Sequence, residues 1–372
     1  MFLIDIIVFL IVLGIVVFVH ELGHFIAAKT SGVKVEEFGL GFPPRLWKKT
    51  IGETQYFIGA IPFGGMTRIF GMDEMDEEKD KDSRGYESKS AWKKLWICGG
   101  GVVFNLLFAV IVFYGLIASS GFKSEQALIF SEYHFPFGNQ VNQVLIAQVV
   151  PDSPAEISGL KSYDVVVGVN GNSINGSKEF STIISENKGH EVSLQLKDGS
   201  EVKITPRVEY PSTEGPLGVG LRDMAVLNYS SIPEKALVGF LHTYNITDYS
   251  VSAMGYIFSY AISHKSINVI ASSMAGPVGI FAITKLTLEK GLYDMLNLIA
   301  ILSIALGVSN LLPIPAMDGA KLIYVGLESA NKKVFSKELQ IKIESIGAIF
   351  LILLAVAIIF KDFIQFKDII FK

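Results

Sequence analysis

Four apolar stretches constrain the fold of this chain more than any other feature of its sequence. They lie at about residues 2–28, 96–118, 292–312 and 343–360. Each is long enough to cross the hydrocarbon core of a bilayer as an α-helix. Half of all residues are hydrophobic and 18% are charged, whereas soluble domains average about 25% charged residues. The sequence therefore predicts a polytopic α-helical membrane protein with about four transmembrane helices.

The first apolar stretch ends in the motif His20-Glu21-Leu22-Gly23-His24. Four residues turn a helix by about 400°, so His20 and His24 project from one face and can share a metal ion. Glu21 lies about 100° further around, where it can act as a general base without being a ligand. This HExxH pattern is typical of zinc peptidases. The alternative is an ordinary helix end facing water, although ionisable groups in a membrane helix are costly and generally functional.

A zinc site needs at least a third protein ligand. The third apolar stretch runs into Asn310-Leu311-Leu312-Pro313-Ile314-Pro315-Ala316-Met317-Asp318-Gly319, where the two prolines end the helix. A carboxylate on broken backbone at membrane depth costs free energy unless it is paired or bound to a metal. We therefore expect Asp318 to complete a Zn2+ site with the two histidines. Taken alone, Asp-Gly after prolines would be an ordinary loop turn.

The loop after the first predicted helix contains an apolar, β-prone segment at about 54–70. Gly64-Gly65 within it is a plausible hairpin turn. The segment is too short to span a bilayer as a helix, so we expect a membrane re-entrant β-hairpin, with a soluble hairpin as the alternative. The charged run at 72–82 predicts a solvated linker. In the second apolar stretch, Gly99–Gly101 permit close helix packing, and Asn105 suits a hydrogen bond across helices, for packing or for catalysis.

Residues 119–227 differ in character, because short alternating strands appear there between turn residues. They predict an inserted α+β domain. Residues 228–291 predict amphipathic helices on the membrane surface, interrupted at Gly276–Ile280. The expected segments are a first helix in 1–30, a loop in 31–95, a second helix in 96–118, the α+β domain in 119–227, surface segments in 228–291, a third helix in 292–320, a loop in 321–342, and a fourth helix with its tail in 343–372.

Lysines and arginines indicate the sidedness of these segments. They cluster near the membrane ends of the 31–95 and 321–342 loops, which places both loops in the cytoplasm and the α+β domain outside. Lys361, Lys367 and Lys372 count against this orientation. Residues 2–19 lack a basic start and a small-residue cleavage site, so they predict a retained helix. The net charge of −4 is too small to suggest a nucleic-acid partner, and the single Cys98 excludes an intrachain disulfide.

The two motifs, the Trp92-Lys93-Lys94 entry to the second helix and the inserted domain resemble the site-2 protease family of intramembrane zinc metalloproteases. The likeness extends over nearly the whole chain and is strongest to the regulator-of-sigma-E protease branch. The inserted domain is similar to a single PDZ domain, on the strength of Val149–Ala155, Gly159-Leu160, Asp164 and Val169-Asn170-Gly171.

This resemblance implies roles for individual residues. His20, His24 and Asp318 would bind Zn2+, and Glu21 would be the general base. Asn310 matches a position linked to handling of the unwound substrate. The hairpin would present the substrate as an added strand, and its substrate-binding residues would be Phe63, Gly64, Gly65 and Met66.

The resemblance also implies partners and a location. Substrates would be single-span membrane proteins, such as anti-sigma-factor-like regulators or remnant signal peptides, cut during regulated intramembrane proteolysis. The protein would lie in the lipid bilayer of a bacterial inner membrane, with its active site towards the cytoplasm and the PDZ-like domain outside. Residues 215–220 would capture a peptide C terminus, although a plain strand fits them equally.

Two other classes of function compete with a protease. The first is a catalytically inactive, membrane-anchored PDZ scaffold with a structural or vestigial metal site, but a structural site needs no base such as Glu21. The second is a transporter, because broken helices with an ionisable centre also mark ion sites. A transporter would predict internal repeats, and the sequence shows none.

Overall fold

The computed structural model of the chain describes residues 2–72, 82–211, 214–330 and 336–370. They form two compact units, one made of 1–116 with 246–372 and the other of 117–245. Most of the predicted charged linker at 72–82 lies outside the described residues, as do the side chains of Pro62, Phe63 and Ile267.

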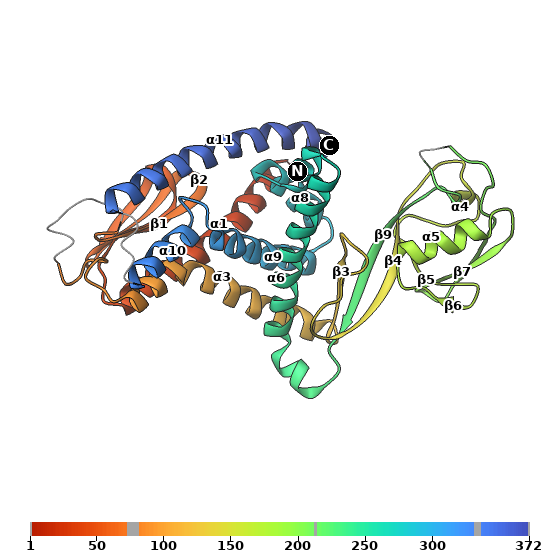
Figure 1. Cartoon of the computed structure of the whole chain (residues 1–372), viewed down its shortest axis with the longest axis horizontal. Coiled ribbons are helices and arrows are strands. Elements are labelled where there is room, and N and C mark those ends of the chain that lie inside the picture. The colour runs from red at the N-terminus through yellow and green to blue at the C-terminus, as the bar shows by residue number, and fades with distance from the viewer. Residues whose placement is uncertain (1, 73–81, 212–213, 331–335, 371–372) are drawn as a thin grey trace. The chain divides into compact units, whose positions relative to one another are not determined.

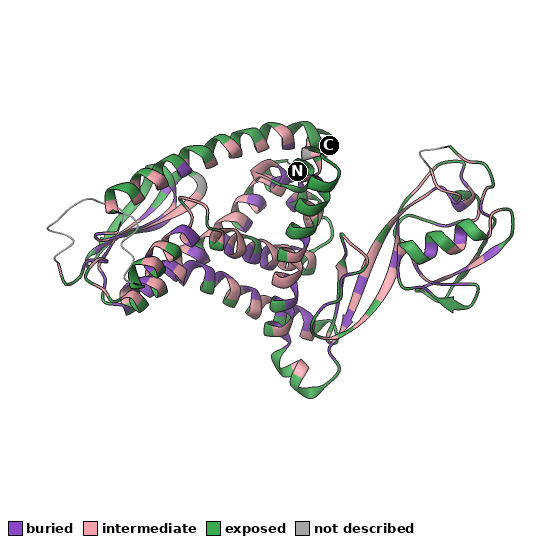
Figure 2. Cartoon of the chain, viewed as in Figure 1, coloured by how far each residue is buried: buried purple, intermediate pink, exposed green. Residues whose placement is uncertain are grey.

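Among the described residues, four helices of the first unit are long and apolar enough to cross a membrane, as the sequence predicts. They are α1 (Phe2–Thr30), α3 (Ala91–Ser119), α9 (Leu292–Leu311) and α11 (Lys337–Ile370) (Figure 1). Helix α11 is exposed along much of its length (Figure 2). Its exposed large apolar side chains include Ile349, Phe350 and Leu353. Such a surface suits lipid rather than water. The chain is an integral membrane protein.

A twisted sheet follows α1 and consists of β1 (Val35–Ile51) and β2 (Thr54–Ile69). Leu40 of β1 pairs with both Ile58 and Gly65, so the first part of β1 lies between the two halves of β2. The predicted hairpin turn at Gly64-Gly65 is therefore wrong. The strands join at Gly52, and Gly64, with φ +90°, lies where β2 passes from one side of β1 to the other.

The Gly-Pro-Val-Gly segment begins a short apolar helix, α8 (Pro277–Leu288), which packs against α1, α9 and α11. Asp362 of α11 is completely buried and accepts hydrogen bonds of 2.8 Å from the N–H groups of Gly276 and Gly279. A Cβ at Gly279 would lie 2.9 Å from Asp362 Oδ2. The glycine thus lets the start of α8 approach this carboxylate. Three further helices of the described residues are α6 (Ile232–Ser263), α7 (Ile267–Ser273) and α10 (Asp318–Ser329).

The second unit is an α+β domain built on a seven-stranded sheet in the order β3-β9-β4-β5-β7-β8, with β6 paired to β5. Its helices α4 (Pro154–Ile157) and α5 (Ser177–Glu186) cover a core that includes Val144, Ile146, Phe180 and Leu194. The strands are β3 (Lys123–Ala127), β4 (Asn139–Val149), β5 (Val165–Val169), β6 (Asn172–Ser173), β7 (Val192–Leu196), β8 (Glu201–Ile204) and β9 (Val219–Asn228).

Candidate metal centre

Three side chains from distant parts of the chain meet at one point. His20 Nε2 and His24 Nε2 each lie 3.2 Å from Asp318 Oδ2, and the two nitrogens are 3.3 Å apart. Both histidines are buried, and Asp318 is half-buried. One possible ligand atom from each residue falls within 4.8 Å of the others. The structure therefore brings together the three residues that the sequence predicts as ligands.

Glycines let α1 and α3 approach closely at this point. Gly23 of α1 lies against Gly100 of α3, and a Cβ added at Gly100 would lie 2.6 Å from Gly23 O. A Cβ at Gly101 would lie 2.5 Å from both His20 Cε1 and His24 Nε2. Gly101 therefore leaves room for the two imidazoles, and Gly100 lets the two helices pack closely.

Groups on α3 orient the two rings. The His24 Nδ1–H donates to the main-chain O of Ile97 at 2.8 Å, which leaves Nε2 with its lone pair directed at the cluster. Asn105 is fully buried, and its amide lies 3.3 Å from His20 Nδ1. Such partners fix the tautomer and the orientation of a metal-binding histidine.

The broken backbone between α9 and α10 positions Asp318. Helix α9 ends at Leu311, before Pro313 and Pro315, and Asp318 is the first residue of α10. Ala316 adopts φ +72°, which is unusual for a residue with a side chain. Gly319 packs against the carbonyl groups of Leu311 and Leu312, where a Cβ would clash. The tight turn thus fixes the carboxylate opposite the histidines.

Glu21 faces the end of β2. The hydroxyl of Thr67 donates to Glu21 Oε2 at 2.6 Å and also lies 3.1 Å from the main-chain O of Glu21. Gly65 lies so close that an added Cβ would clash with the Glu21 side chain. The last segment of β2, residues 65–69, therefore runs directly beside the HExxH helix.

The donor set fits a catalytic zinc ion. Two imidazole nitrogens and one carboxylate oxygen are the ligand types that zinc prefers, and three protein ligands leave a fourth position open. The buried position and the hydrogen bonds to both rings are also typical of such sites. The same three residues would serve poorly as a Ca2+ or Mg2+ site, because those ions prefer oxygen ligands.

Comparison with known proteins gives the family. The profile of peptidase family M50 matches residues 8–354. The chain belongs to this family of site-2 proteases. A Helicobacter pylori protein named as a candidate zinc metalloprotease is 30% identical over 376 residues, which cover 96% of this chain and 98% of the relative. A similarly named Clostridium perfringens protein is 29% identical over 348 residues, or 94% and 95% of the two chains. The zinc metalloprotease RasP of Oceanobacillus iheyensis is 25% identical over 445 residues, or 96% and 98%.

The other predicted site residues of this M50 member lie in two places. The amide nitrogen of Asn310 donates to Leu306 O within α9 at 2.9 Å, and among the described residues no hydrogen bond joins it to the His–Asp cluster. Gly65 and Met66 pair with Leu40 and Gly39 of β1. Gly64 packs on the ring of Phe42. The side chain of Phe63 lies outside the described residues.

Sequence reasoning did not find two partners of the site. Thr67 belongs to no recognisable sequence motif, and its contact with Glu21 depends on how β2 crosses β1. The Ile97 carbonyl cannot be recognised from the sequence at all, because every residue carries one. The signal for Asn105, a buried amide within an apolar helix, was present but compatible with simple helix packing.

Proposed function

We propose that this protein is an intramembrane zinc metalloprotease that hydrolyses peptide bonds within the transmembrane segments of single-span membrane proteins. One observation carries the proposal: His20, His24 and Asp318 converge among membrane-length helices. The names of the M50 relatives support the same chemistry.

Each site residue has a defined task in this reaction. His20, His24 and Asp318 would hold the ion, which when bound supplies a Lewis acid for the peptide carbonyl and for water. Glu21 accepts a proton from the attacking water and passes it to the leaving amine. The Thr67 hydroxyl holds the Glu21 carboxylate in place. Asn310 would contact the unwound substrate near the reacting carbonyl.

The edge of β2 would present the substrate. Residues 65–69 pair with β1 on one side, and no strand in the described part of the chain pairs with the other side. A helical substrate must unwind before its carbonyl becomes accessible, and pairing with this edge would replace the lost hydrogen bonds. Residues 63–66 would then lie along the substrate, beside Glu21.

The location and the substrates follow from this proposal. The basic loops favour a bacterial inner membrane protein with its site towards the cytoplasm and the PDZ-like unit outside. That unit would bind peptide C termini at residues 215–220. Anti-sigma-factor-like regulators or remnant signal peptides, cut during regulated intramembrane proteolysis, fit as substrates because they are anchored by one helix.

The Glu21→Gln variant tests the proposal. We expect cleavage of a single-span model substrate to fall by about 10²–10⁴-fold, while the zinc content measured by mass spectrometry stays at that of the wild type. Glu338→Gln, an exposed change in α11, is the matched control and should cleave normally. Full cleavage by Glu21→Gln would remove Glu21 from the mechanism. A wild-type protein that binds zinc but cleaves no membrane substrate would favour the inactive scaffold.

A further inference from the structure

The sheet of the 117–245 unit separates along part of β4. Strand β5 pairs with β4 only through Val144–Val166 and Leu145–Val165. Beyond that point Gly168 and Val169 pair with β6 instead. The first half of β4, residues 139–143, therefore pairs with β9 on one side and has no strand on the other among the described residues.

The direction of the main-chain groups in β4 follows from hydrogen bonds on both of its sides. Ile146 N–H donates to Asp164 O, and Tyr163 N–H donates to Ile146 O, so the groups of Ile146 point away from β9. Direction alternates along an antiparallel strand, so the groups of Asn142 and Gln140 also point away from β9. The same alternation holds in β9, where the main-chain O of Asp223 points away from β4 and accepts from the Leu128 N–H.

The main-chain N–H of Asn142 consequently lacks a partner in the described part of the chain. An edge with unpaired N–H and C=O groups is a template for another strand. Gln143 adds an unmet acceptor beside this unmet donor, because its Oε1 is buried without a hydrogen-bond donor.

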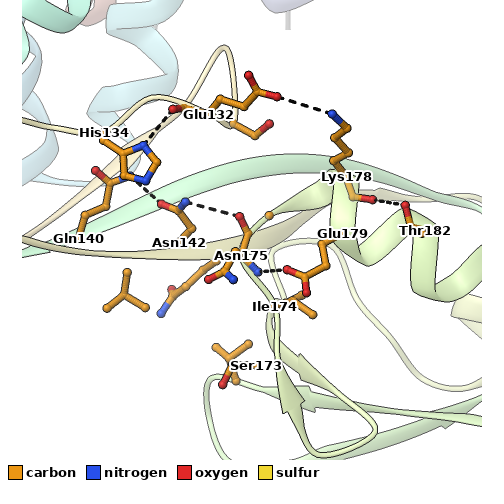
Figure 3. Close-up of a pocket in the computed structure, with 15 residues that line it drawn as sticks. Glu132, His134, Gln140, Asn142, Ser173, Ile174, Asn175, Lys178, Glu179 and Thr182 are labelled. Atoms are coloured by element: carbon orange, nitrogen blue, oxygen red, sulfur yellow. Dashed lines mark hydrogen bonds and ion pairs between the residues drawn. The ribbon is translucent and has the colours of Figure 1, made fainter.

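A cavity of about 830 Å³ lies along this open edge (Figure 3). Its walls come from β4, from the segment after β6, from the first turns of α5 and from the 131–134 loop. Glu132 and Lys178 form an exposed ion pair of 3.6 Å between this loop and α5. The lining residues are Ser131, Glu132, His134, Gln140, Val141, Asn142, Gln143, Val167, Ser173, Ile174, Asn175, Gly176, Lys178, Glu179 and Thr182.

Hydrogen bonds hold the walls of the cavity in place. Gln140 accepts from the N–H of Phe135 at 2.8 Å and donates to Tyr133 O at 2.9 Å, which fixes the 131–135 loop. Asn142 Nδ2 donates to Asn175 O at 3.5 Å, and Asn175 N–H donates to Glu179 at 2.8 Å. The shape thus exists before any ligand binds, which lowers the entropic cost of binding.

We propose that this cavity binds an extended internal segment of polypeptide as an additional strand against residues 140–143 of β4. Backbone pairing suits the open N–H and C=O groups, and walls that mix amide, hydroxyl and charged groups with Val141, Val167 and Ile174 suit a segment that carries both polar and apolar side chains. The lining includes no Phe, Tyr or Trp on which a sugar ring would stack. Residues 215–220 do not line the cavity, so this site differs from the expected carboxylate site and needs no free C terminus.

A change at Asn142 isolates the backbone contribution. Asn142→Pro removes the N–H that faces the cavity but none of the bonds from Val141 and Gln143 to β9, because proline is tolerated where the N–H is unpaired. Asn142→Ala keeps this N–H and is the matched control. Both are made in full-length protein in lipid nanodiscs, with Glu21→Gln so that no peptide is cut.

The probe is a library of random twelve-residue peptides with amidated C termini. We expect selected peptides to bind the parent and Asn142→Ala, and to bind Asn142→Pro at least about tenfold more weakly. Hydrogen exchange gives a second readout, because peptide binding to the parent should protect the amide of Asn142 while those of Val141 and Gln143 stay protected throughout. This readout holds even if the proline variant misfolds.

Several outcomes would overturn the proposal. They are the absence of any amidated binder, equal binding by a folded Asn142→Pro variant, binding that needs a free carboxylate, and binding of an oligosaccharide in place of a peptide. None of them bears on cleavage, so the proposed protease activity stands or falls separately.

Discussion

The orientation of His20 depends on one buried amide. Asn105 Nδ2 faces His20 Nδ1 at 3.3 Å, while Asn105 Oδ1 is buried without a donor. A half-turn of the amide exchanges these atoms, so that Oδ1 accepts from the His20 Nδ1–H. This arrangement satisfies the buried oxygen and leaves His20 Nε2 free to bind a metal. We infer that Asn105 holds His20 in its metal-binding tautomer.

Replacement of Asn105 tests this role. Asn105→Leu keeps the volume but removes the acceptor, and we expect zinc affinity to fall by about 10–100-fold. Asn105→Asp keeps an acceptor at the same place and should restore most of the affinity. Competition with a chromophoric chelator measures both. Unchanged zinc binding by a folded leucine variant would reduce Asn105 to a packing residue.

Gly101 gives a sharper test of the space around the site. In Gly101→Ala the new methyl group would lie 2.5 Å from His20 Cε1 and His24 Nε2. Both rings must move, so we expect loss of zinc and of cleavage. Gly115→Ala, in the same helix with nothing within 4 Å of the added Cβ, should keep both and should slightly favour the helix. Equal zinc contents in the two variants would contradict the observed packing.

At the scale of elements, one carboxylate joins α8 to α11. Asp362 accepts from the N–H of Gly276, just before α8, and from that of Gly279 in its first turn, which a helix start otherwise leaves unpaired. A negative charge there also interacts favourably with the helix dipole. The contact therefore holds the start of α8 against α11.

Asp362→Ala should therefore loosen α8. Hydrogen bonds to a charged acceptor contribute about 1.5–3 kcal/mol each, so we expect faster amide exchange in residues 276–282 and a lower melting temperature in detergent. Asp368→Ala, at an exposed position of the same helix, is the control and should change neither. Unaltered exchange in the Asp362 variant would show that apolar packing alone holds α8.

At the scale of the whole molecule, the sequence predicts the membrane helices and the metal-binding residues better than it predicts the contacts between distant segments. The HExxH spacing and the apolar lengths follow from helix geometry, so α1, its histidines and the membrane helices were predictable. Asp318, 294 positions from His24, was predictable because an isolated histidine pair needs another ligand. The crossing of β2 over β1, the Thr67–Glu21 contact and the partner of Asp362 were not, because each depends on how distant segments pack.

The 117–245 unit should lose stability as the pH falls. Burial lowers the pKa of His242 from 6.5 to about 3, and its Nδ1 lies 2.9 Å from the hydroxyl of Tyr229. Below pH 6.5 the unfolded chain binds a proton that the folded unit does not bind until about pH 3. Stability is therefore complete above pH 6.5 and falls through this window, by about 2 kcal/mol between pH 7 and pH 5.

Hydrogen exchange of β9 between these two pH values, corrected for intrinsic rates, measures the effect. His242→Gln should flatten the dependence, whereas His190→Gln, at an exposed position, should leave it intact. If the pH dependence of stability persists in the His242 variant, groups other than His242 cause it.

The three groups that α3 offers to the histidines are evenly spaced. Ile97, Gly101 and Asn105 follow one another at intervals of four, so they share one face of the helix. A single inserted or deleted residue between them would rotate the rest of α3 by about 100° and misalign the glycine or the amide. Exposed neighbours such as Val103 and Leu107 can vary among apolar residues, because they lie in a helix that can cross the membrane. Among homologous genes, length changes should therefore spare codons 97–105 and accumulate in the connecting loops.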